Sequence, residues 1–265
     1  MKKNFLIFGV VLIVLSFTAY GFMNSNEVIE ESLDASVVEE KMYPETKKEF
    51  NVFEDFIYEI GPRFGGITKE ELLKATSIKD FITEEQINWI NRLKLVSVII
   101  FKDEKRSDIR ANGSTFEFNK EQLELIQSFD VSTSFVINAE YQQMNYETGQ
   151  LEGSQSTPHL TVVPKKQAEY VMGMDALKYF LKESTEEVRV GVDPEKLKPA
   201  KLMFTVSKEG TIIDAKLDRS SNYPKVDEKM IELIFNTPGQ WLPAENIQGE
   251  KVDQELVVSF GLRGC

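Results

Sequence analysis

The clearest alternation of hydrophobic and polar residues lies in the last quarter of the chain. Apolar side chains occupy every second position over residues 202–206 and 213–217, and a three-residue loop, 208–210, separates the two runs. Residues 227–234 then carry apolar side chains at helical intervals, and residues 255–262 alternate again. A period of two predicts half-buried strands, and a period of 3.6 predicts an amphipathic helix. The pattern therefore predicts a β-β-α-β unit whose sheet has one face covered by the helix and one face open.

Shorter patterns of the same kind run through the middle of the chain. Thr68, Thr83 and Asn119 each precede a short amphipathic stretch, and they predict the N-terminal caps of three helices. Apolar or alternating runs predict strands over residues 56–60, 94–101, 131–141 and 160–162. The pair Asn112-Gly113 predicts a turn. Together these elements predict a separate α+β domain with antiparallel strands over residues 50–165.

A helix is expected where the two units meet. Residues 165–184 hold apolar side chains at helical spacing, with Gly173 as a weak point in the middle and Asp175 as a cap at which the helix could restart. The second domain is therefore placed at residues 166–265. With 265 residues, the chain is long enough for two such domains, and the fold class that we expect is α+β.

The N-terminus has the pattern of an exported protein. Lys2 and Lys3 precede an uncharged, apolar stretch. Two interpretations of residues 1–22 remain open: a signal peptide cleaved after Gly21, or a retained membrane anchor. Residues 23–49 are acidic and poor in large apolar side chains, so we expect a disordered linker there. In either case the remainder of the chain is expected outside the cytoplasm.

Charge and residue counts narrow the classes of function. The chain has 43 acidic and 31 basic residues and a formal net charge of −12, which argues against nucleic-acid binding. Its only histidine, His159, stands at the start of a predicted strand, and its only cysteine, Cys265, is the last residue. Acidic pairs such as Glu70-Glu71 mostly stand near helix starts, where they favour the helix dipole. We therefore expect no catalytic residues, no cofactor, no metal ligands and no small-molecule substrate.

Six stretches of the C-terminal part follow one another in an order that belongs to a known family. They are an entry helix, a hairpin, a Ser-Ser turn followed by Pro224, an Asp at a helix start, a loop around Pro-Gly, and a final strand: residues 173–181, 204–212, 220–224, 227, 238–244 and 249–260. This arrangement resembles the C-terminal domain of TonB-type energy transducers, especially versions from Bacteroidetes-like bacteria. The resemblance covers about a third of the chain, roughly residues 170–262, and residues 50–164 resemble no family that we can name.

The resemblance implies a mechanical function and its partners. In the family, an inner-membrane helix couples to a proton-driven motor complex, and the C-terminal domain grips a peptide of an outer-membrane receptor in support of TonB-dependent transport. The peptide adds as a strand beside the last β-strand, whose edge offers backbone N–H and C=O groups. The residues that the resemblance implies for this edge are Gln254, Glu255, Leu256, Val257, Val258, Ser259 and Phe260. Of these, Glu255, Val257 and Ser259 are expected to point outward and set selectivity. The alternative is an ordinary edge strand that the charges of Lys251, Asp253 and Glu255 guard against pairing.

Three departures from the family bear on energy coupling. The N-terminal apolar stretch contains Ser16 but no His, residues 23–49 form no long Pro-rich spacer, and residues 50–165 stand where that spacer belongs. The implied periplasmic protein-binding module is soluble if the signal is cleaved, or tethered to the inner membrane if it is retained. The alternative function is a structural or scaffolding envelope protein that uses a TonB-like fold without energy coupling.

The two predicted domains also invite a comparison with each other. Residues 94–101 and 201–205 both begin with Lys-Leu, and each run is followed by a second strand, a helix and a long strand. One interpretation is that the middle domain is a diverged β-β-α-β copy. The other is that two unrelated α+β domains share a common order of elements.

Overall fold

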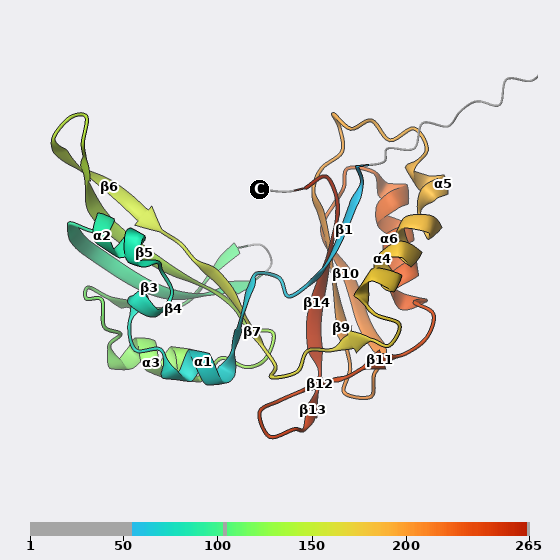
Figure 1. Cartoon of the computed structure of the whole chain (residues 1–265), viewed down its shortest axis with the longest axis horizontal. Coiled ribbons are helices and arrows are strands. Elements are labelled where there is room, and N and C mark those ends of the chain that lie inside the picture. The colour runs from blue at the N-terminus through green and yellow to red at the C-terminus, as the bar shows by residue number, and fades with distance from the viewer. Residues whose placement is uncertain (1–54, 103–104, 264–265) are drawn as a thin grey trace, which may run out of the picture. The chain divides into compact units, whose positions relative to one another are not determined.

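The structure is a computed structural model that describes residues 55–102 and 105–263 (Figure 1). The predicted export segment, residues 1–22, and the predicted acidic linker, residues 23–49, lie outside the described residues. The described residues form two large β-sheets accompanied by helices, which confirms the predicted α+β class.

The first large sheet is built from the middle of the chain. Its strands are β2 (Gly65–Thr68), β3 (Arg92–Lys102), β4 (Lys105–Gly113), β5 (Ser134–Asn145), β6 (Gln150–Ser156) and β7 (His159–Val163). Across the sheet their order is β2-β7-β5-β3-β4, and β6 pairs with the C-terminal part of β5. β2 and β7 are parallel, whereas the other neighbouring strands are antiparallel. The long central pair β3 and β5 carries most of the buried side chains of this sheet.

Four short helices accompany the first sheet: α1 (Lys69–Lys74), the 3₁₀ helix η1 (Ile78–Asp80), α2 (Glu84–Trp89) and α3 (Lys120–Gln127). The predicted caps Thr68, Thr83 and Asn119 are confirmed. Each accepts a hydrogen bond from the backbone N–H three residues on, and that residue's side chain accepts one from the N–H of the cap. The third of these partners, Gln122, is fully buried, and its amide also donates to the Val96 carbonyl at 3.1 Å, which ties α3 to β3.

The second large sheet is antiparallel and has the order β1-β14-β9-β10. Its strands are β1 (Ile57–Gly61), β9 (Ala200–Val206), β10 (Ile212–Arg219) and β14 (Gln254–Gly261). Three helices lie together on one of its faces (Figure 1), namely α4 (Met174–Ser184), α5 (Glu186–Arg189) and α6 (Pro224–Phe235). Two short strand pairs complete this part: β8 (Glu169–Tyr170) with β11 (Trp241–Leu242), and β12 (Ala244–Glu245) with β13 (Lys251–Val252). The predicted β-β-α-β order is therefore present as β9, β10, α6 and β14.

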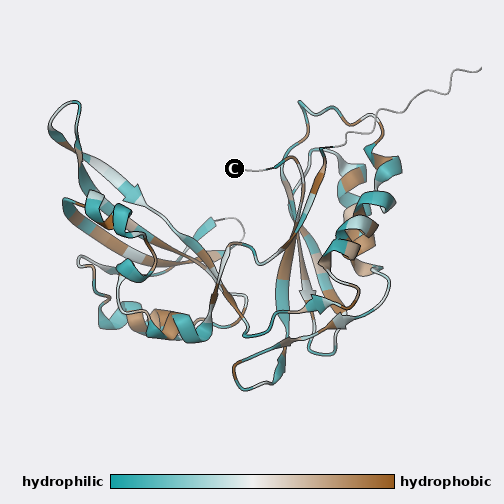
Figure 2. Cartoon of the chain, in the orientation of Figure 1, coloured by the Kyte–Doolittle hydropathy of each residue, from teal (hydrophilic) through white to brown (hydrophobic). Residues whose placement is uncertain are grey.

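Each large sheet has its own hydrophobic core. Hydrophobic residues are interspersed with hydrophilic ones along the strands and helices, as Figure 2 shows. The core of the second sheet joins Phe204 and Phe260 to Leu177 of α4 and Met230 of α6. Trp241 belongs to this core, and it is 6% exposed. The core of the first sheet is formed around Leu72, Ile78, Ile126, Phe129 and Phe135.

Several local predictions were wrong. The helix expected over residues 165–184 begins only at Met174, because β8 and a turn with Gly173 at φ 87° precede it. The pair Asn112-Gly113 lies in β4 rather than in a turn. A second strand after residues 94–101 was expected without bounds, and β4 is that strand; β6 was not expected. Most side chains of both strands are polar and exposed, which leaves no alternation to detect. Helix α6 begins at Pro224, three residues before the expected start at Asp227.

The two large sheets share an order of elements. β3, β4, α3 and β5 follow one another along the chain and pair as β5-β3-β4, just as β9, β10, α6 and β14 pair as β14-β9-β10. In both sheets the first strand of the unit is central and both of its neighbours are antiparallel to it. Both interpretations of the sequence expect this shared topology: a diverged copy, and two unrelated α+β domains with a common order of elements.

Candidate functional site

All seven residues of the predicted binding edge lie in β14, but this strand is not at the edge of its sheet. β9 pairs with it on one side. On the other side β1 pairs with it antiparallel, from Ile57 opposite Gly261 to Gly61 opposite Val257. The prediction of an open edge is therefore wrong over residues 257–260. The alternation of β1 was visible in the sequence, but it was assigned to the domain at residues 50–165 rather than to this sheet.

The remaining part of this edge is occupied as well. The backbone N–H of Glu255 donates to Oγ of Ser132 at 2.9 Å. Ser132 has a left-handed conformation, φ 69°, and its own N–H donates to the Val162 carbonyl at 2.8 Å. Gln254 accepts a 2.7 Å hydrogen bond from the N–H of Ala168 through its side chain. Among the described residues, the side of β14 that faces away from β9, hereafter the β14 edge, is thus covered from Glu255 to Gly261.

The side chains expected to point outward from β14 do not lie on an open face. Val257 is 4% exposed, and Met203 beside it on β9 is 7% exposed. Burial raises the pKa of the Glu255 carboxyl, and the neighbouring Arg63 partly opposes this. Ser259 is half-buried. The prediction of an open sheet face is therefore wrong here, whereas the inward positions Leu256, Val258 and Phe260 are buried as predicted.

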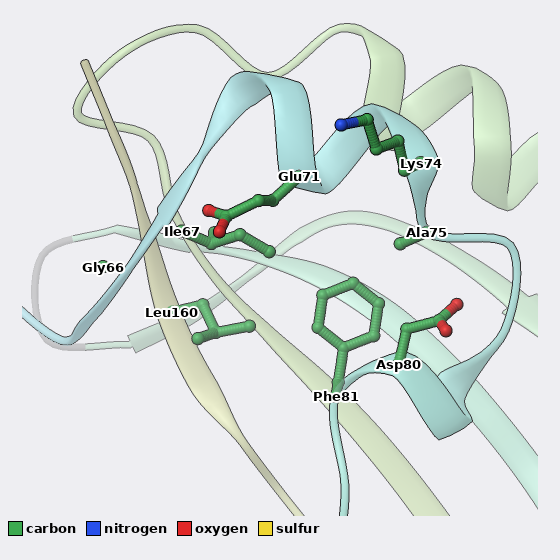
Figure 3. A pocket seen from close by; sticks show the side chains of 8 residues that line it. All are labelled: Gly66, Ile67, Glu71, Lys74, Ala75, Asp80, Phe81 and Leu160. Carbon is green, nitrogen blue, oxygen red and sulfur yellow. The ribbon is translucent and has the colours of Figure 1, made fainter. Parts of the chain in front are cut away.

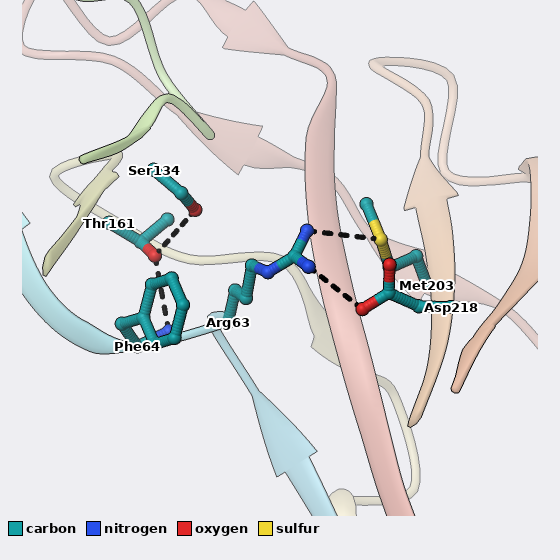
Figure 4. A network of polar contacts seen from close by, with 6 residues as sticks. All are labelled: Arg63, Phe64, Ser134, Thr161, Met203 and Asp218. Atoms are coloured by element: carbon teal, nitrogen blue, oxygen red, sulfur yellow. Dashed lines mark hydrogen bonds and ion pairs between the residues drawn. The ribbon is translucent and has the colours of Figure 1, made fainter. Parts of the chain in front are cut away.

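Arg63 joins the two sheets at this face (Figure 4). It stands two residues after the end of β1, and its Nη2 donates to Oδ2 of Asp218 on β10 at 2.8 Å, with side-chain exposures of 4% and 7%. Its guanidinium carbon lies 5.7 Å and 5.3 Å from the ring centroids of Phe64 and Phe101. The next residue, Phe64, donates its backbone N–H to Oγ1 of Thr161 on β7 at 3.1 Å. Arg63 therefore contacts the second sheet, and Phe64 contacts the first. Loss of one partner of a buried ion pair, here Arg63 or Asp218, typically costs about 3–5 kcal/mol.

β1 is held by its side chains as well as by its backbone. Phe56, immediately before it, and Tyr58 within it are 4% and 8% exposed and belong to the core of the second sheet. The Tyr58 hydroxyl forms a short hydrogen bond with Oγ1 of Thr185, at the end of α4. Burial raises the pKa of Tyr58, so its neutral form is favoured in the fold. Arg189 of α5 lies over the Phe56 ring, 5.5 Å from its centroid. β1 is thus an integral part of the second sheet.

Charged side chains line a cavity of about 470 Å³ beside α1, and two of them accept hydrogen bonds from backbone N–H groups (Figure 3). Glu71 accepts hydrogen bonds from the N–H and hydroxyl of Thr68, and these lower the pKa of its carboxyl. Asp80 accepts from two backbone N–H groups at 2.9 Å and 3.0 Å. Lys74 pairs with Glu70 at 2.8 Å. These contacts support the interpretation of the acidic residues as helix caps.

His159 begins β7, as expected of a residue at a strand start. Its Nδ1 lies 2.8 Å from the Thr157 carbonyl oxygen, and its ring packs against Phe64 and Phe101 at centroid distances of 5.1 Å and 5.6 Å. Cys265 lies outside the described residues. Within residues 55–102 and 105–263, no three His, Cys, Asp or Glu side chains are grouped so that they could hold a metal ion.

Comparison of the chain with models of protein families, with curated proteins and with solved structures finds no match. None of the helices formed by the described residues has the length and apolar composition that crossing a bilayer requires.

Proposed function

We propose that the chain is a scaffolding protein of the cell envelope that uses a TonB-like C-terminal fold without gripping a receptor peptide at its last strand. The observation that carries this proposal is that β1 of the same chain fills the β14 edge. Export is expected from residues 1–22, and the strand order β14-β9-β10 with α6 on one face supports the family resemblance. Its partner would be another envelope protein.

The energetics of β1 argue against replacement by a partner's peptide. An incoming strand would restore the backbone hydrogen bonds, but a peptide without matching aromatic side chains would leave the places of Phe56 and Tyr58 empty. Burial of each such side chain stabilises a fold by about 1.5–3 kcal/mol. The exchange would therefore cost about 3–6 kcal/mol, which weakens binding roughly 10²- to 10⁴-fold.

The energy-transducing function remains the second candidate, because the β-β-α-β order that carries the resemblance is present as β9, β10, α6 and β14. It needs β1 to leave the β14 edge. A disulfide between β1 and β14 separates the two functions, since Glu59 and Ser259 are direct cross-strand partners on the outward face. The test variant is Glu59→Cys with Ser259→Cys, in a Cys265→Ser background that prevents mispairing.

The measurement is reversible cross-linking in the cells that produce the protein, followed by identification of the cross-linked envelope partners. A matched control carries Thr205→Cys with Asp214→Cys, which ties β9 to β10 and leaves β1 untouched. The scaffold proposal expects the same partners for the locked, control and reduced proteins. Partners that disappear only from the locked variant and return on reduction would show that β14 is opened in use. Absence of any specific partner from all variants would contradict the interaction function itself.

A further inference from the structure

A cavity of about 230 Å³ lies on the first sheet, where the end of α2 meets the β5–β6 hairpin. Five described residues line it, and none of them carries a charge: Trp89, Asn91, Gln143, Met144 and Tyr146. The cavity is smaller than the roughly 300–1,000 Å³ pockets that enclose whole drug-sized ligands, so it suits a single ring of a longer molecule. We name it the amide-aromatic cavity.

The two aromatic side chains of this cavity are exposed. Trp89, the last residue of α2, is 45% exposed, and Tyr146, in the turn after β5, is 91% exposed. The other tryptophan of the chain, Trp241, is 6% exposed because it lies in the core of the second sheet. Tryptophan and tyrosine are the side chains that most often anchor a bound partner. An exposed pair of them beside a cavity therefore points to a binding surface.

Hydrogen bonds hold the backbone around the cavity in place. The Asn91 N–H donates to the Gln142 carbonyl at 2.9 Å, and Oδ1 of Asn91 accepts from the Met144 N–H at 2.8 Å. These two bonds fix the end of α2 against β5. In the turn that carries Tyr146, Oδ1 of Asn145 accepts from the Glu147 N–H at 2.8 Å. The site is thus built on an ordered backbone, which lowers the entropy that binding must remove.

The two carboxamides supply both donors and acceptors. Each has two N–H donors and an oxygen with two lone pairs, and only the Asn91 oxygen is already engaged, by the Met144 N–H. No hydrogen bond between described residues uses the Gln143 side chain. Hydroxyl groups donate and accept at once, so they match this set. The carbonyls of a proline-rich peptide, another ligand of aromatic grooves, can only accept.

We propose that the amide-aromatic cavity binds one sugar ring of a neutral saccharide chain. A pyranose ring with equatorial hydroxyls has polarised C–H groups on its faces and hydroxyls around its rim. The C–H face packs on the Trp89 or Tyr146 ring, whose π face is negative. The rim hydroxyls bond to Asn91 and Gln143, and the uncharged lining favours a neutral saccharide over an acidic one. This site is independent of the β14 edge, so its failure leaves the scaffold function untouched.

Tryptophan fluorescence of the full chain tests the proposal, because Trp89 is the exposed one of its two tryptophans. The probes are cellotetraose, tetra-N-acetylchitotetraose, sorbitol and decaproline. At millimolar concentration, one of the two saccharides is expected to shift the emission to shorter wavelength and to shield Trp89 from quenching by acrylamide. Sorbitol, which has hydroxyls but no ring, is expected to bind roughly tenfold more weakly or worse. The saccharide that binds more tightly distinguishes a glycan with acetamido groups from one without.

The opposite results are equally clear. Failure of both saccharides to bind at millimolar concentration would overturn the proposal, and binding of decaproline alone would assign the cavity to a peptide. Sorbitol binding as tightly as the saccharides would overturn the stacking of a sugar ring on the aromatic side chains.

Variants then locate the binding site, with titration calorimetry as the measurement. Tyr146→Ala removes a highly exposed ring, so it is expected to fold normally and to weaken the saccharide roughly tenfold. Gln143→Ala removes one carboxamide and is expected to weaken it about fivefold. Tyr179→Ala removes an exposed tyrosine from α4 and is expected to leave binding unchanged. Equal affinity in all three folded variants would show that the saccharide binds elsewhere and would overturn the proposal.

Discussion

The turn between β9 and β10 provides the sharpest test of how the second sheet is built. Gly210 has φ 81°, a conformation that costs a residue with a Cβ about 1–2 kcal/mol. A Cβ at this position would also lie 2.3 Å from the carbonyl oxygen of Trp241, where real Cβ atoms stay beyond 3.0 Å. The two groups would therefore have to separate by at least 0.7 Å, the difference between 3.0 and 2.3 Å.

The Trp241 backbone cannot move freely to make this room. Trp241 is 6% exposed, and its ring packs against Tyr170 and Phe204 at centroid distances of 5.6 Å and 5.5 Å. Forcing extra atoms into a packed region typically costs about 1–3 kcal/mol. With the backbone strain of about 1–2 kcal/mol, Gly210→Ala is expected to lower the free energy of unfolding by about 2–5 kcal/mol.

Gly149 offers a matched control. It also has a positive φ, 68°, but a Cβ there would meet no atom within 4 Å. Gly149→Ala is therefore expected to cost only the backbone strain, about 1–2 kcal/mol. Urea unfolding followed by tryptophan fluorescence measures both variants. Equal losses for the two would refute the close approach of Gly210 to Trp241, and no loss for Gly210→Ala would refute the turn geometry itself.

Three further predictions follow from single contacts and from the N-terminal sequence. Glu255→Gln should raise stability near neutral pH, because burial raises the pKa of this carboxyl and its charge opposes folding. Thermal melts should show this gain shrinking as the pH falls, and it should vanish below roughly 4, the ordinary pKa range of Glu in an unfolded chain. Tyr58→Phe should lose about 1 kcal/mol with its hydrogen bond to Thr185. The raised pKa of Tyr58 means that its neutral form stabilises the wild-type fold fully below roughly pH 10 and less at higher pH. Tyr58→Phe lacks this decline, and thermal melts at alkaline pH would detect the difference. A reporter enzyme that is active only outside the cytoplasm should work when fused after Phe50, and a stable but inactive fusion would contradict export.

Local structure could be predicted from the sequence because it depends on neighbouring residues. The caps at Thr68, Thr83 and Asn119 need only a side chain and a partner three residues on. The positive φ of Gly210 follows from the short loop between two alternating runs. The order β9, β10, α6 and β14 followed from periodicity alone. Where polar side chains line both faces of a strand, as in β4 and β6, the same signal is missing.

What the sequence could not decide is which strand pairs with which. Alternation shows that one face of β1 is buried, but the backbone hydrogen bonds of a strand carry no label for their partner. β1 therefore could be placed in the second sheet only by the tertiary structure, and with it residues 257–260 of the predicted edge became an interior position.

The ion pair of Arg63 with Asp218 was hidden for a related reason. The two residues stand 155 positions apart in the sequence, and β10, which carries Asp218, is placed by its pairing with β9. Periodicity depends on residues a few positions apart, so it indicated the elements and their buried faces. The partner of each strand depends on backbone groups that are alike in every residue, so only the folded chain shows which distant side chains meet.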